Sequence, residues 1–68
     1  MPKYYTYEIG DRVIVNDHAK SGMKYDVGKE GVILDTLEVS QYDYEVLLDS
    51  GYLSRFKEIE LNKLNIQE

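Results

Sequence analysis

Residues 42–49, with the sequence YDYEVLLD, restrict the possible folds of this chain more than any other stretch. The larger apolar side chains occupy every second position there, at Tyr42, Tyr44, Val46 and Leu48. A period of two is typical of a strand, because successive side chains of a strand point to opposite faces of its sheet. We therefore predict a strand with this face in a core and with Asp43, Glu45, Leu47 and Asp49 toward water.

The same period occurs in two earlier stretches. In RVIV, Val13 and Val15 share one face and Ile14 lies opposite, and in GVILDT, Val32 and Leu34 share a face. Both stretches are rich in β-branched residues, which favour strands. We predict a strand in each.

Turn signals and a last apolar stretch complete the pattern. The sequence DSG directly after residues 42–48 predicts a tight hairpin turn with Gly51 at a positive φ, followed by a strand in YLSRF. Further on, IELNKL carries Ile59, Leu61 and Leu64, which predicts a single helical turn leading into a short final strand.

The stretch DHAKSGMKYDVGKE, between the first two predicted strands, has no sustained period. We predict a long loop whose Met23, Tyr25 and Val27 pack back against the sheet. Five short strands separated by turns indicate an all-β fold, a small closed barrel over residues 9–68. Residues 1–8 are expected to form an N-terminal extension, and its Tyr4, Tyr5 and Tyr7 cannot all be buried. They suit a protein interface, nucleobase stacking or a segment that covers the barrel end, and the net negative charge favours protein over nucleic acid.

The charge of the chain is concentrated in its middle third. The 68 residues have a net charge of −5, yet residues 30–54 alone carry six acids and no base. Nucleic acid would be repelled there, since phosphate contacts supply most of its affinity, whereas a basic protein would be attracted. The carboxylates expected to gather on one side of the sheet are Asp35, Glu38, Asp43, Glu45 and Asp49, with Leu47 and Tyr52 as apolar anchors.

The residues that could carry other chemistry are few. The chain has no cysteine, and its one histidine, His18, lies in the loop with Asp17 and Ser21. A flexible loop without a pocket does not bring base and nucleophile together, so we interpret His18 as a surface residue and the protein as not an enzyme. We predict no metal and no cofactor. The alternative contact is with RNA or the transcription machinery, through Lys20, Lys24 and Lys29.

The order of GDRVIV, GKEGVIL, YEVLLDSG and FKEIEL resembles KOW or SH3-like barrels, which implies a five-stranded SH3-like barrel over roughly residues 9–64. More narrowly, MPKY, HAKSGMKYDVGKEGVI, YDY and FKEIEL resemble YorP-type proteins of Bacillus phages and prophages. In size and acidity, without a shared motif, the chain is also similar to small phage proteins that occupy the DNA-binding surface of the host nucleoid protein HU.

These features lead to one functional hypothesis. The protein is expected to be a phage-encoded mimic of DNA that presents its carboxylates to a basic host protein such as HU, without binding DNA itself. No apolar run of the chain approaches the roughly 18 residues that cross a bilayer, and residues 1–12 lack the apolar segment of a signal peptide. The expected location is the host cytoplasm.

Overall fold

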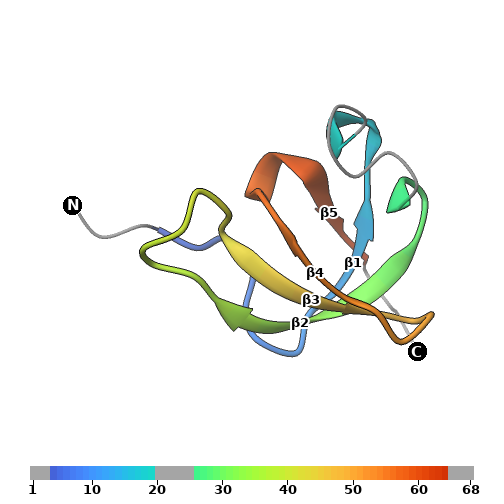
Figure 1. Ribbon diagram of the computed structural model, residues 1–68, viewed down its shortest axis with the longest axis horizontal. Helices are drawn as coiled ribbons and strands as arrows, with labels where there is room; N and C mark the ends of the chain where they lie inside the picture. The colour runs from blue at the N-terminus through green and yellow to red at the C-terminus, as the bar shows by residue number, and fades with distance from the viewer. Residues whose placement is uncertain (1–3, 20–25, 65–68) are drawn as a thin grey trace.

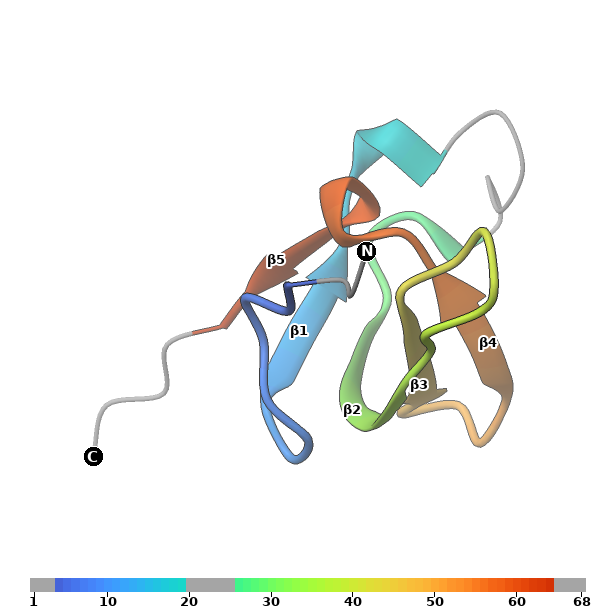
Figure 2. The ribbon, with the colours of Figure 1, turned by 90° about the vertical axis from the view of Figure 1, so that its left-hand side faces the viewer.

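The computed structural model describes residues 4–19 and 26–64. Within these residues, five strands form one antiparallel sheet in the order β4-β3-β2-β1-β5 (Figure 1). The strands are β1 (Arg12–Val15), β2 (Glu30–Thr36), β3 (Tyr44–Leu48), β4 (Leu53–Phe56) and β5 (Leu61–Lys63). Two single turns of 3-10 helix, η1 (Asp17–Ala19) and η3 (Glu58–Glu60), join them. The sheet curls so that β1 and β5 lie at an angle to β2, β3 and β4 (Figure 2), an open barrel that fits a small SH3-like fold.

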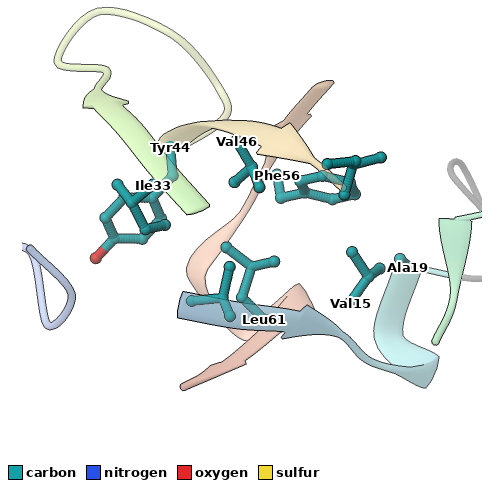
Figure 3. Close-up of a cluster of buried hydrophobic side chains, with 9 residues drawn as sticks. Val15, Ala19, Ile33, Tyr44, Val46, Phe56 and Leu61 are labelled. Carbon is teal, nitrogen blue, oxygen red and sulfur yellow. The ribbon is translucent and has the colours of Figure 1, made fainter. Parts of the chain in front are cut away.

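The inside of the curl is an apolar core. Val46 and Phe56 of one half of the sheet face Val15 and Leu61 of the other (Figure 3). The alternation predicted for β3 is confirmed, since Tyr44, Val46 and Leu48 are all buried. The buried core residues are Val13, Val15, Ala19, Ile33, Tyr44, Val46, Leu48, Phe56 and Leu61.

The face shared by Val32 and Leu34 proves to be the solvent face of β2. Gly31 and Ile33 point inward instead, and Leu34 is exposed. Three apolar residues in a row, VIL, are compatible with either phase of a strand, so the sequence pattern could not show which face is buried. The register also shifts between Ile33 and Asp35, where the ladder to β3 is irregular.

The hairpin turn predicted at Gly51 and the helical turn predicted before the last strand are both confirmed. Gly51 has a φ of 98° and donates its N–H to Leu48 O at 2.8 Å, which closes the hairpin between β3 and β4. The helical turn expected in IELNKL is η3, and it leads directly into β5.

The loop after β1 begins with a helical turn that the sequence pattern did not predict. Residues 17–19 form η1, and Ala19 at its end is fully buried in the core. Val27 packs against the core as predicted, whereas Met23 and Tyr25 lie outside the described residues. His18 is exposed on η1.

Residues 4–8, which we call the N-terminal strap, lie against the core. The rings of Tyr5 and Tyr7 pack against Tyr44, with centroids 5.7 and 5.6 Å from its ring. Three of the seven tyrosines therefore form one aromatic cluster, while Tyr4 is 92% exposed. This arrangement matches the expectation that the three tyrosines of the strap are not all buried.

Hydrogen bonds to one carboxylate hold the strap in place. Glu58 Oε1 accepts from Tyr44 Oη at 2.6 Å and from the Thr6 N–H at 2.9 Å. Tyr44 Oη in turn accepts from the Tyr7 N–H at 3.1 Å, and Tyr7 Oη donates to Leu61 O at 3.1 Å. Burial raises the pKa of Glu58, but the hydrogen bonds from Tyr44 and Thr6 outweigh it and leave that pKa below its ordinary value. Burial, together with the bond to Glu58, raises the pKa of Tyr44 to about 12.

We expect Tyr44→Phe to destabilise the protein by about 1–3 kcal/mol at neutral pH, the range for a lost hydrogen bond to a charged group. Because the folded-state pKa of Glu58 is depressed, its contribution is present above the unfolded value of about 4.3 and is lost as pH falls through the folded value. The difference between the two proteins in urea unfolding should therefore narrow in acid. Tyr52→Phe, at an exposed ring, is the control. An equal loss at neutral and acid pH would contradict this account.

Gly31 is the position where β2 comes closest to β3. A Cβ there would lie 2.5 Å from Leu47 O, 2.9 Å from Val46 Cγ1 and 3.0 Å from Leu48 Cα. Two of these atoms are backbone and cannot move independently of the ladder. The sheet therefore requires glycine at position 31 for a steric reason.

We expect Gly31→Ala to lower the free energy of unfolding by about 1–3 kcal/mol, the usual cost of overpacking a core. Urea unfolding followed by circular dichroism measures the change. Ser50→Ala, at the exposed hairpin tip, should change stability by less than about 0.5 kcal/mol. A fully stable Gly31→Ala variant would show that β2 and β3 can separate locally.

Candidate protein-binding face

The solvent side of β2, β3 and β4, which we call the outer face, carries an apolar row that crosses all three strands. Val32 pairs with Leu47, and Leu47 pairs with Leu53 on the edge strand. Directly opposed side chains in antiparallel strands lie about 5 Å apart, so the three form a continuous strip. Val32 and Leu47 are half-buried and Leu53 is 57% exposed.

Leu34 of β2, 41% exposed, extends the strip. Tyr52 is 71% exposed, but it precedes Leu53 and shares the strand phase of the inward Phe56, so it is not part of the row. Single apolar residues are common on protein surfaces, but a contiguous apolar patch rimmed by polar groups is a mark of an interaction site. The outer face has this composition.

One side of the apolar row is bordered by an ion cluster around Arg12. Its Nη1 and Nη2 bind Asp49 Oδ1 and Oδ2 at 2.9 and 2.8 Å, and Nη2 lies 3.4 Å from Glu30 Oε1. The two bonds to Asp49 form the parallel bidentate geometry that suits guanidinium and carboxylate. They lower the pKa of Asp49 and raise the pKa of Arg12. Asp49 was expected to meet a partner, but its carboxylate is already matched within the molecule.

The other side of the row is more acidic. Glu45 pairs across the ladder with Asp35 on one side and with Arg55 on the other. The Arg55 Nε to Glu45 Oε2 distance of 3.8 Å makes this a loose ion pair. The Asp35 side chain accepts a hydrogen bond from the neighbouring Thr36 N–H at 2.9 Å and is exposed.

Asp43 does not project from the outer face as its place in the alternation indicated. It lies just before β3, and its Oδ2 accepts a 2.8 Å hydrogen bond from the Glu58 N–H at the start of η3. The reason is that the strand begins at Tyr44, so the period of two no longer orients residue 43. Asp43 therefore helps to position Glu58 and the strap.

Glu38 is exposed in the loop between β2 and β3. Burial raises the pKa of Tyr5, and the negative charges of Glu38, Asp43 and Asp35 raise it further. Together with Glu45 they make one end of β2 and β3 strongly acidic. Four of the five predicted carboxylates thus gather at this end, and Asp49 lies apart with Arg12.

Of the three lysines predicted as an alternative contact with RNA, the structure describes only Lys29. Lys29 Nζ lies 3.3 Å from Asp26 Oδ1, so its charge is opposed by a neighbouring carboxylate. Lys20 and Lys24 lie outside the described residues. No observation in residues 4–19 and 26–64 favours the RNA contact over the outer face.

In the part of the chain that the structure describes, no group of three or more histidine, cysteine or acidic side chains is arranged to hold a metal ion. The described residues also include no helix of the length and apolarity required to span a membrane.

The site predicted from the sequence did not include the two arginines or two of the three residues of the apolar row, Val32 and Leu53. Leu53 and Arg55 share the outer face because they alternate with the inward Phe56, and the short pattern LSRF does contain that signal. No local signal connects Arg12 with Asp49, because 37 positions separate them and only the ladders β1–β2 and β2–β3 bring them together.

Comparison with known proteins gives consistent results. The family model described as YorP protein matches residues 1–66. A similar curated protein, the SPbeta prophage-derived uncharacterized protein YorP of Bacillus subtilis (strain 168), is 41% identical over 64 residues, covering 94% of this chain and 90% of that protein. The NMR structure of Bacillus subtilis protein YorP has a TM-score of 0.86 and 38% identity, covering 96% of this chain and 77% of that one.

We expect Arg12→Gln to raise the pKa of Asp49 toward the ordinary value of about 3.9, because the substitution removes both hydrogen bonds and the positive charge. An NMR titration of the aspartate side chains measures this shift. Arg55→Gln makes the same change of charge elsewhere on the outer face and should leave the pKa of Asp49 unchanged. An Asp49 pKa that is insensitive to Arg12→Gln would show that the ion pair does not form in solution.

Proposed function

The chain belongs to the YorP family, and from that premise we propose that it is a non-catalytic acidic binding protein that docks a basic protein on its outer face. The observation that carries the proposal is the apolar row of Val32, Leu47 and Leu53, bordered by the acidic end of β2 and β3. An apolar centre supplies affinity when it is dehydrated, and a charged rim selects the partner and accelerates association.

The charge of the outer face defines the class of partner. Of the residues that the structure describes, Glu30, Asp35, Glu45 and Asp49 are opposed there by Arg12 and Arg55, so this part of the face is net negative. A complementary surface has one or more protruding apolar side chains surrounded by lysine and arginine. Such complementarity gives fast association that weakens with salt.

A narrower form of the proposal is mimicry of DNA toward a nucleoid protein such as HU, in the cytoplasm of a Bacillus host. Asp35, Glu38 and Glu45 support it, since a row of carboxylates on a stiff sheet resembles the charge density of a nucleic-acid backbone. Asp49 adds little to such a row, because Arg12 balances its charge. The mimicry is thus assigned to the acidic end of β2 and β3, and the apolar row supplies contacts that DNA does not.

We expect the double substitution Asp35→Asn and Glu45→Gln to weaken binding to a basic partner about tenfold, the combined value of two surface ion pairs. Anisotropy of the labelled protein titrated with purified HU, at about 0.05 M and about 0.5 M salt, measures affinity and its screening. The matched control, Glu8→Gln and Asp17→Asn, removes the same charge outside β2, β3 and β4.

Two further measurements separate the possible results. If HU does not bind, the protein is immobilised and exposed to a Bacillus lysate. The basic proteins that high salt then elutes are used as probes in place of HU. Labelled RNA and DNA are tested at low salt. Equal binding by the double variant and its control, or measurable affinity for nucleic acid, would overturn the proposal.

A further inference from the structure

The edge strand β4 presents hydrogen-bonding groups that the sheet does not use. Leu48 donates its N–H to Tyr52 O, and Asp43 donates to Phe56 O, so the even-numbered residues of this strand face β3. In an antiparallel ladder the backbone groups of alternate residues point to opposite sides. The N–H and C=O of Leu53 and Arg55 therefore point away from β3, where the sheet of the described residues has no further strand.

Exposed edges of this kind pair with strands of other molecules unless something blocks them. Charged side chains on the edge, proline and bulges are the usual blocking features, and β4 has only Arg55 among these. Its neighbours Tyr52 and Leu53 are exposed and apolar. Within the described residues, this edge of the sheet is therefore unpaired and partly apolar.

We propose that β4 pairs antiparallel with β4 of a second copy of this chain, which joins two sheets into one. A two-fold axis at Leu53 places this residue opposite Leu53 of the second copy. The apolar rows of the two outer faces then meet, in the order Val32, Leu47, Leu53 and again Leu53, Leu47, Val32. This inference is independent of the proposed function, since it needs no foreign partner.

The pairing of side chains favours this register, because the alternatives place Arg55 opposite a like charge or opposite an apolar residue. The outward groups restrict pairing to odd residues opposite odd residues. A shift of two positions toward the C-terminus places Arg55 opposite Arg55, and the intermediate register places Arg55 opposite Leu53. With Leu53 opposite Leu53, Arg55 lies opposite Gly51 of the second copy, beside the hairpin that carries Asp49. Arg55 is also the one base on β2, β3 and β4, so β4 is where two acidic molecules repel each other least.

Proline and alanine at position 55 provide the test. Because the Arg55 N–H is not used by the ladder to β3, Arg55→Pro removes an outward donor and leaves the inward bonds intact. The preceding Ser54 is already extended, as proline requires. Arg55→Ala removes the same side chain and keeps the N–H, so it is the matched control.

Sedimentation equilibrium from about 10 μM to about 1 mM spans the affinities of a small interface. We expect the unmodified chain and Arg55→Ala to increase in mass with concentration, and Arg55→Pro to associate at least about tenfold more weakly, as the loss of about 1.4 kcal/mol would give. Leu53→Lys, at an exposed position, places like charges opposite each other and provides a second disrupting variant if the proline variant unfolds. A monomer at every concentration, or a dimer that neither Arg55→Pro nor Leu53→Lys weakens, would overturn the proposal.

Discussion

The pairing of β2 with β3 is the constraint on which both faces of the molecule depend. Because the ladder places Ile33 opposite Val46, it builds the core, and because Val32 is opposite Leu47, it builds the apolar row outside. A slip of one residue would exchange the two faces. The close approach at Gly31 prevents such a slip, since any larger side chain would meet the backbone of β3.

Most of the fold was predictable from the sequence because small β domains encode it locally. The period of two in β3, the glycine of the hairpin and the helical turn before β5 all depend on neighbouring residues. Prediction failed where the signal was ambiguous or distant. The run VIL fits two phases, and the strap is held by contacts such as Tyr7 Oη to Leu61 O, 54 positions apart. No local pattern shows such a bond.

The candidate site was predictable only in part, for an electrostatic reason. Charge segregation along the chain suggested a uniform acidic surface, but folding brings Arg12 to Asp49 and places Arg55 beside Glu45. A chain that concentrates its acids in one segment is more stable when folding brings distant basic side chains next to those acids. The sequence indicates that most of the acids gather near one end of β2 and β3, but it cannot show that Asp43 turns toward Glu58 or that Arg12 balances Asp49.

Because the arginines balance only some of the acids, the two sides of the apolar row differ in negative charge. On one side of the apolar row, Arg12 forms a bidentate pair with Asp49 and lies 3.4 Å from Glu30, so this cluster keeps one negative charge that is not balanced. On the other side, Asp35 and Glu45 face a single loosely held arginine, and Glu38 and Asp43 of the segment between β2 and β3 add further negative charge. A partner whose basic residues flank one side of an apolar anchor would bind in one orientation, with its cations toward the acidic end. Such an arrangement supports the proposed docking surface over an acidic surface that serves solubility alone, because solubility favours charges of both signs mixed across the surface without an apolar patch.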